Sequence, residues 1–163
     1  MVQLKAVQGV IAEIEKYRED DNCTLVFNIV SHSGFNEITR FVITPDTYAI
    51  DQETLKVGDS VTAWYDANRP VILIYPPQYE AVAIGRNHPG LMLKGDFFNS
   101  QLISSDGMLQ LIPAPETVIT QTNGQIYPGN PANHNLIVIY GPSTKSIPAQ
   151  TTPQRIIVFC KQM

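Results

Sequence analysis

Charged side chains are sparse in this chain, and basic ones are the scarcer kind. Only 16% of the residues are charged, and 15 acidic against 11 basic side chains give a formal net charge of −4. Binding to nucleic acid or to an anionic membrane depends on clustered Lys and Arg that displace counterions. The sequence contains no such cluster. We therefore expect neither a general nucleic-acid binder nor a membrane-surface protein.

Long apolar runs are missing as well. None approaches the ~18 residues of a membrane span, and Met1–Val10 lacks the charged and apolar regions of a secretory signal. We therefore expect a cytoplasmic protein. In that compartment the two cysteines, Cys23 and Cys160, are expected to be reduced and partly buried thiols, with a disulfide between them as the alternative.

Catalytic signatures are also absent. The chain has no Gly-x-Ser-x-Gly elbow, no His-Glu-x-x-His pair and no glycine-rich phosphate loop. Cys160 ends an apolar run, which favours a buried, inert thiol over a nucleophile. His32, His88 and His134 fall in predicted turns without the spacing of a metal site. We therefore expect a protein that is not an enzyme and that holds no cofactor and no metal.

Helical periodicity is nearly absent, apart from a single helical turn predicted over Asp51–Val57. The chain is instead rich in short runs of Val, Ile, Thr, Tyr and Phe that end at turn residues, which is typical of strands. In the first half we expect five strands, over 6–17, 24–31, 37–44, 60–66 and 79–86, with a turn at residues 32–34. In the second half, Asp106-Gly107 and Asn123-Gly124 indicate tight hairpins, and the last strand is expected over 154–161.

The sequence also contains an internal repeat. Thr44–Ile50 is similar to Ala114–Thr120, and Val61–Tyr65 is similar to Leu136–Tyr140. A Pro-rich tract follows in both halves, and the next strand begins at Glu80 in the first half and at Arg155 in the second under a gap-free alignment. A repeat of this kind predicts two lobes built alike. We expect a first lobe over 1–86, a linker over 87–90 and a divergent second lobe over 91–163.

These features resemble a known architecture. Leu55–Val61, the five expected strands and the link between the third and the fourth resemble small OB-fold domains, which are closed β-barrels. The tract Tyr140–Gln150 also resembles a motif of uncharacterised β-rich domains of Gram-positive bacteria. The resemblance implies an all-β protein of two OB-like barrels from a bacterium. It also implies a binding surface on a barrel face and its loops, with no particular ligand.

The two Pro-rich tracts are the strongest functional candidates. They cover residues 66–79 and 141–153, and each joins two apolar strands by a connection longer than an ordinary hairpin. In an OB barrel, the first tract would line the ligand face. The run Val71–Ile74 is costly to expose, at about 25 cal/mol per Å² of apolar surface. We expect this run to be covered by the barrel or an inter-lobe seam, by a partner protein, or by a small ligand.

The resulting hypothesis is a non-catalytic binding or structural module that binds a partner protein or self-associates through these tracts. The alternative is an OB-type face that binds single-stranded nucleic acid or an oligosaccharide, with aromatic side chains stacking on flat rings. The candidate binding residues are Trp64, Tyr65, Arg69, Tyr75, Tyr79, Tyr140 and Lys145.

Overall fold

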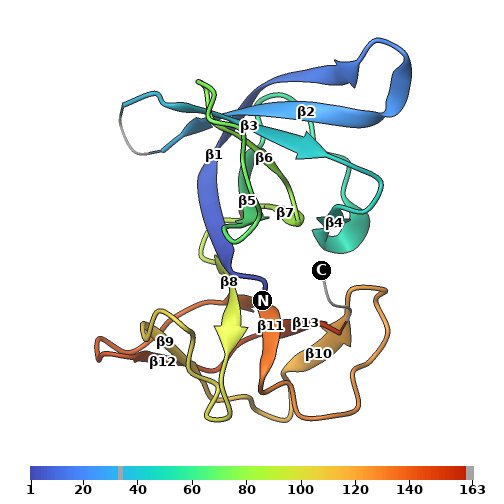
Figure 1. Ribbon diagram of the computed structural model, residues 1–163. Helices are drawn as coiled ribbons and strands as arrows, with labels where there is room; N and C mark the ends of the chain where they lie inside the picture. The colour runs from blue at the N-terminus through green and yellow to red at the C-terminus, as the bar shows by residue number, and fades with distance from the viewer. Residues whose placement is uncertain (33–34, 161–163) are drawn as a thin grey trace. The chain divides into compact units, whose positions relative to one another are not determined.

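The computed structural model describes residues 1–32 and 35–160, and nearly all of its regular structure is β-strand (Figure 1). The all-β class predicted from the sequence is therefore confirmed. The only helical element among the described residues is a 3₁₀ turn, η1 (Ile50–Gln52), which is shorter than the expected helical turn over Asp51–Val57. Part of the expected turn at residues 32–34 and the expected strand end at Lys161 lie outside the described residues.

The chain divides into two compact units. The first contains Met1 and Lys5–Asn87, and the second contains Val2–Leu4 and His88–Met163. Every strand pairing described below joins two strands of the same unit.

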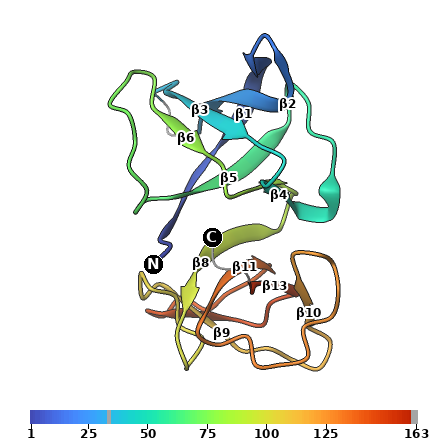
Figure 2. The ribbon, with the colours of Figure 1, turned by 45° about the vertical axis from the view of Figure 1, so that its right-hand side comes forward.

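The first unit is a single seven-stranded sheet in the order β4-β7-β5-β1-β2-β3-β6 (Figure 2). Its long meander β1-β2-β3 is antiparallel, while β6 is parallel to β3 and β4 is parallel to β7. The strands are β1 (Leu4–Arg18), β2 (Asp21–Ser31), β3 (Ile38–Ile43), β4 (Tyr48–Ala49), β5 (Ser60–Asp66), β6 (Gln78–Glu80) and β7 (Ala83–Arg86).

Side chains that face inward at alternate positions of these strands form the core of the first unit. Phe27 and Ile29 on β2 face inward, whereas Asn28 between them binds Arg40 on the opposite face. Val61 and Ala63 on β5 face the same core, and Phe41 on β3 is fully buried in it. Because side chains alternate between the two faces of a strand, this pattern of β-branched and aromatic residues fixes the register.

The last extended segment of the first unit, residues 78–86, pairs with two different strands. Within residues 78–86, the amide of Ala81 donates to the carbonyl of Val42 on β3 at 2.9 Å. The very next amide, that of Val82, donates to the carbonyl of Trp64 on β5 at 2.8 Å. The strand predicted as continuous from Tyr79 to Arg86 is therefore interrupted at these two residues, where its pairing passes from β3 to β5.

The second unit contains a four-stranded sheet in the order β10-β13-β11-β8 and a two-stranded parallel sheet of β12 and β9. Leu136 and Val138 on β11, Ile156 and Val158 on β13, and Phe98 on β8 are fully buried in its core. The strands are β8 (Met92–Phe98), β9 (Leu109–Leu111), β10 (Val118–Gln121), β11 (His134–Tyr140), β12 (Ala149–Thr151) and β13 (Arg155–Phe159).

The final strands of the two units have the same neighbours, but one part of the sequence alignment is wrong. β7 pairs with β5 so that Ala83 lies opposite Trp64, and β13 pairs with β11 so that Arg155 lies opposite Ile139. The position of Arg155 therefore corresponds to Ala83, not to Glu80. The gap-free alignment failed because the connection over residues 141–154 is three residues shorter than the connection over residues 66–82. Similarity between short apolar runs does not reveal this difference.

Candidate binding groove

A groove of about 500 Å³ opens on the first unit at the end of its sheet where β5 leads into the Pro-rich connection. Three segments form it: the β1–β2 hairpin, the ends of β3 and β5, and the connection with β6. Its lining residues are Tyr17, Arg18, Asp21, Thr24, Val42, Thr44, Tyr65, Asp66, Arg69, Pro70, Val71, Ile72, Ile74, Gln78, Tyr79 and Glu80.

One edge of the groove is a run of exposed apolar side chains, Val71–Tyr75, which we call the apolar ridge. It lies in the long connection between β5 and β6 (Figure 2). Ile72 is 76% exposed, Leu73 is 96% exposed and Tyr75 is 87% exposed. The expected burial of Val71–Ile74 inside a barrel of the first unit is therefore wrong, and the seam between the lobes stays a prediction.

The base of this connection is fixed by a buried carboxylate. The side chain of Asp66 accepts a hydrogen bond from the amide of Asn68 at 2.9 Å, and its carbonyl accepts one from the amide of Arg69 at 3.2 Å. At the other end, the carbonyl of Pro77 accepts from the amide of Arg40 at 2.9 Å. Both ends of the connection are thus anchored to the sheet, while the ridge between them faces solvent.

An aromatic pair forms the inner wall of the groove. The rings of Tyr65 and Tyr79 stack with centroids 3.8 Å apart, and both lie about 6 Å from Phe41 in the core. Burial, together with the hydrogen bond to the hydroxyl of Tyr79, raises the pKa of Tyr65 to about 12. Tyr65 therefore presents a neutral phenol to the groove at physiological pH.

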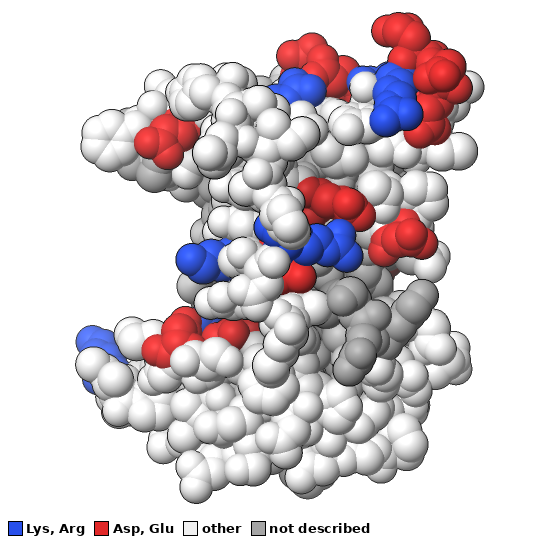
Figure 3. Space-filling view, in the orientation of Figure 1, with Lys and Arg blue, Asp and Glu red and all other residues white. Residues whose placement is uncertain are grey.

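The charged groups around the groove are mixed but carry an acidic excess. Arg69 pairs with Glu80 at 3.4 Å and lies 3.9 Å from Asp66. The backbone amide of Cys23 binds Asp21 at 2.8 Å and is the main reason why the pKa of Asp21 is lowered. Exposed Glu19 and Asp20 follow Arg18 at the tip of the β1–β2 hairpin, where Figure 3 shows acidic side chains gathered at the upper right. A ligand with a positive charge suits this environment better than a polyanion.

The groove brings together Tyr65, Arg69 and Tyr79 of the seven residues predicted to bind. Tyr75 lies on the ridge next to the groove but is not among its lining residues. Tyr140 and Lys145 belong to the second unit.

The prediction that Trp64 binds a ligand is wrong. Trp64 is fully buried on β5, and its indole nitrogen has no hydrogen-bond partner among the described residues, so its ring offers no face to a ligand. Trp64 and Tyr65 are neighbours on one strand and point to opposite sides, and the sequence alone did not decide which of them would face the groove.

Sequence reasoning missed the wall provided by the hairpin, which consists of Tyr17, Arg18, Asp21 and Thr24. A signal was present in the unusual length of β1 and β2, because strands this long extend beyond the sheet and can form one side of a groove.

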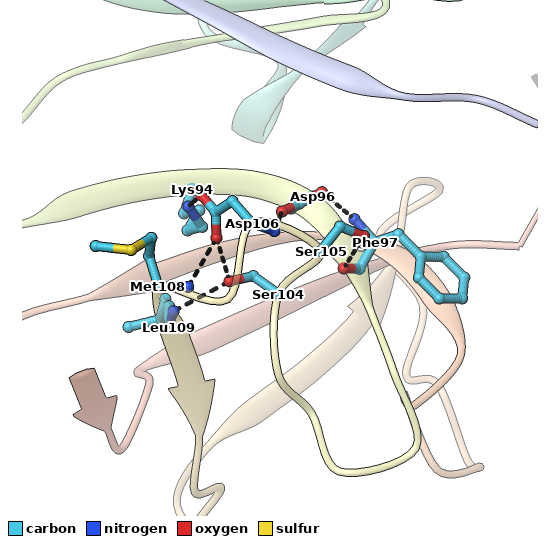
Figure 4. A network of polar contacts seen from close by, with 8 residues as sticks. All are labelled: Lys94, Asp96, Phe97, Ser104, Ser105, Asp106, Met108 and Leu109. Atoms are coloured by element: carbon cyan, nitrogen blue, oxygen red, sulfur yellow. Dashed lines mark hydrogen bonds and ion pairs between the residues drawn. The ribbon is translucent and has the colours of Figure 1, made fainter. Parts of the chain in front are cut away.

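A second polar cluster lies in the second unit around the turn at residues 104–108 (Figure 4). Asp106 accepts hydrogen bonds from Lys94 at 2.5 Å, from the hydroxyl of Ser104 at 2.6 Å and from the amide of Met108 at 3.0 Å. Burial opposes the charge, but the bonds from Lys94 and Ser104 prevail and lower the pKa of Asp106. These bonds hold the turn closed around Asp106, so we assign the cluster a structural role.

Asp96 lies beside this turn in a different environment. Its carboxylate accepts from the amide of Phe97 at 2.8 Å and from the amide of Asp106 at 3.2 Å (Figure 4). Burial nevertheless raises the pKa of Asp96. Burial also raises the pKa of Tyr140, whose hydroxyl lies in the field of Lys94 and Asp106.

Cys23 and Cys160 are free and exposed, so the expected burial of both thiols is wrong. Across residues 1–32 and 35–160, no three His, Cys, Asp or Glu side chains are placed to hold a metal ion. No helix within the described part of the chain has the length and apolarity to cross a membrane.

Comparison of this chain with known proteins gives no match to a family model, to a curated protein or to a solved structure.

Proposed function

We propose that this chain is a non-catalytic module that binds a polypeptide partner, and that the groove of the first unit with its apolar ridge is the contact surface. The observation that carries this proposal is the exposure of five consecutive large side chains, Val71–Tyr75, on a unit whose core is otherwise well packed. Contiguous exposed apolar surface of this kind marks interaction sites in soluble proteins.

The ridge has properties that suit binding. Removing apolar surface from water yields roughly 25 cal/mol per Å², and Leu73 and Tyr75 expose almost their whole side chains. Both ends of the connection are anchored by hydrogen bonds to the sheet, at Asp66 and Pro77. A loop held in this way loses less conformational entropy on binding than a free one, which favours affinity.

The pairing pattern supports an OB-like barrel as the scaffold of each unit. In the first unit, residues 78–86 pair with β3 through β6 and with β5 through β7. In the second, β12 pairs with β9 and β13 with β11 in the same senses, parallel and antiparallel. A last strand that pairs on both sides closes a sheet on itself and leaves fewer free edges.

A β-solenoid of stacked coils is the competing description of an all-β chain with a repeat. Each coil of a solenoid pairs with the next coil along the chain. Here the long ladders are antiparallel, and each joins two strands of the same unit: β1–β2 and β2–β3 in the first, and β8–β11 in the second. This arrangement favours two barrels over stacked coils.

Matched hydrogen bonds support an origin of the two units by duplication. The hydroxyl of Thr47 donates to the carbonyl of Ala81, and that of Thr117 donates to the carbonyl of Pro153, both at 2.8 Å. Each hydroxyl also accepts, at 3.0 Å, from the backbone amide three residues earlier. In each unit, the turn that ends at this threonine is therefore bonded to the segment just before the last strand.

The test is capture of partners from the native cell lysate by immobilised wild-type protein and by two variants. The variant Ile72→Ser/Leu73→Ser removes the ridge, and Ile126→Ser is the matched control because Ile126 is an exposed apolar side chain of the second unit. All three proteins must show the same thermal unfolding. A stoichiometric partner that the ridge variant loses and the control keeps supports the proposal. A partner that all three retain, or no partner with any of them, overturns it.

The alternative function, binding of an oligosaccharide or single-stranded nucleic acid, is favoured by one observation. The stacked rings of Tyr65 and Tyr79 line the groove, and stacking on aromatic side chains is how barrel faces hold flat rings. Because Trp64 is buried, its fluorescence is a poor reporter, so a labelled oligo-dT or a labelled β-glucan oligosaccharide should be followed by anisotropy instead. Saturable binding that Tyr79→Ala abolishes would establish this alternative.

A further inference from the structure

The second unit carries a loop in the same place as the ridge of the first. This second-unit loop, residues 141–148, joins β11 to β12, just as the connection with the ridge joins β5 to β6. It presents one large apolar side chain, Ile147, which is 81% exposed. It also presents Lys145, which is exposed and forms no ion pair with the described part of the chain.

Hydrogen bonds hold the second-unit loop in one conformation. Thr144 and Gln150 exchange two of them: the amide of Thr144 donates to the carbonyl of Gln150, and the amide of Gln150 donates to the hydroxyl of Thr144, both at 2.9 Å. The hydroxyl of Ser146 donates to the carbonyl of Pro148 at 2.8 Å. Ile147 and Lys145 therefore project from an ordered loop, and we call these two side chains the knob. An ordered loop loses little conformational entropy when it binds.

The groove of the first unit has the complementary character. Its apolar side is formed by Val71, Ile72 and Ile74. Its charged groups carry a small excess of carboxylates, because Asp66 and Glu80 share Arg69 and the only other cation of the lining is Arg18. Asp21 lies in the same lining. The groove thus offers apolar contact to a side chain such as Ile147 and a favourable field to a cation such as Lys145.

We propose that the partner of the groove is a second copy of this chain, and that the second-unit loop of one copy docks in the first-unit groove of the next. Ile147 contacts the apolar side of the groove, and Lys145 lies near Glu80 and Asp21. This inference rests on the proposed function, because it identifies the occupant of the same groove.

Such a contact joins two different surfaces of the same molecule. It is therefore heterologous, and repeated contacts build chains that end only by closing into a ring. Stable complexes bury ~1,200–2,000 Å² in total, and we expect a single loop in a groove to bury less. We therefore expect assembly that grows with protein concentration and that weakens with salt because an ion pair contributes.

Sedimentation equilibrium of two complementary variants tests the contact. The knob variant is Lys145→Glu/Ile147→Ser, and the groove variant is Ile72→Ser/Ile74→Ser. The average mass of the wild type should rise above the 18.1 kDa of the monomer as concentration increases, while each variant alone stays monomeric. In a mixture of the two, the intact loop of one variant should fit the intact groove of the other, so that dimers form and growth stops there.

Several results would overturn the inference. A wild type that stays monomeric at all concentrations would overturn it. A knob variant that still assembles alone would also overturn it, because its assembly would point to contact between two grooves. A mixture that forms no dimers would also overturn it. Ile126→Ser is the matched control, and it should assemble like the wild type. Far-UV circular dichroism must first establish that every variant is folded.

The same proteins separate this inference from the proposed function. If the wild type is monomeric but captures a foreign protein that the groove variant loses, self-association fails and the proposed function stands. If the groove variant alters neither assembly nor capture, both fail. Restoration of assembly by combining Lys145→Glu with Glu80→Lys would identify the ion pair directly.

Discussion

Tyr65 and Tyr79 stack face to face at the inner wall of the groove, with ring centroids 3.8 Å apart and planes inclined by 10°. They come from β5 and from β6, the two strands that the long connection joins. The stack therefore ties together the two ends of the connection that carries the apolar ridge. It also gives the inner wall of the groove its aromatic character.

The first prediction concerns the ionisation of Tyr65. Its pKa is raised to about 12 by burial and by the hydroxyl of Tyr79. In a spectrophotometric pH titration, Tyr65→Phe should remove a step near that pH, and Tyr79→Phe should move the step to lower pH. Since the folded pKa lies above the unfolded value, the stability that this group contributes is present below pH 10 and is lost as pH rises through 12. A titration curve unchanged by Tyr65→Phe would contradict the assignment.

The second prediction concerns the two equivalent threonines. Thr47→Val and Thr117→Val each remove a hydroxyl that donates to a carbonyl and accepts from an amide. Each should lower the free energy of unfolding by roughly 1–3 kcal/mol, because partly buried partners lose their hydrogen bond. Urea denaturation measures both, and the two costs should be similar if the turns are equivalent. Clearly unequal costs would argue against a shared role in the two units.

The third prediction concerns Asp106 and acid stability. Asp106→Ala leaves Lys94, Ser104 and Met108 without their common acceptor and should cost roughly 1–3 kcal/mol at neutral pH. Because the folded pKa of Asp106 is lowered, its contribution is present above the unfolded value of 3.8 and is lost as pH falls through the folded pKa.

The difference in stability between wild type and Asp106→Ala should therefore shrink as pH falls below 3.8. Asp96 acts in the opposite sense, since its raised pKa makes protonation favour the folded state. Urea denaturation at a series of pH values measures the difference. Asp46→Ala, which removes an exposed carboxylate, is the control and should leave stability at neutral pH nearly unchanged.

The fourth prediction concerns the close approach of β1 and β2 at Gly9. A Cβ atom at this position would lie 2.1 Å from the carbonyl oxygen of Val30 and 2.7 Å from a methyl carbon of Ile29. Because the first obstacle is backbone, Gly9→Ala should destabilise the fold at or above the upper end of the ~1–3 kcal/mol usual for overpacking. Gly141→Ala is the control, since its nearest neighbour would lie at an ordinary 3.8 Å. Thermal unfolding that treats the two variants alike would contradict the prediction.

The strands were well predicted because their signal is local. The expected strand over 60–66 coincides with β5, and that over 24–31 lies within β2, since alternating β-branched and aromatic residues suit a half-buried pleated surface. The two-residue strand β4 was missed because it is too short to show alternation. The interruption at Ala81–Val82 was missed because it arises from a change of pairing partner rather than from the residues themselves.

The candidate site was only partly predictable. The length and composition of the first tract pointed to the connection that carries the ridge, and to Arg69 and Tyr79 beside it. The burial of Trp64 contradicts its predicted role in binding, and the exposure of Val71–Ile74 runs against the apolar character of these side chains. Hydrophobicity predicts that a side chain gains from being covered, but it does not say whether the fold or a partner covers it.

The sequence by itself determined that this protein is built from strands, that Pro-rich connections interrupt them, and that its net charge is negative. These properties follow from the period of side chains along the chain and from local backbone restrictions. Only the tertiary structure decided that the β1–β2 hairpin and the ridge form two sides of one groove, with Tyr65 stacked on Tyr79 between them. Such contacts depend on which strands pair and in which register, and pairing is a property of the whole sheet that no single segment encodes.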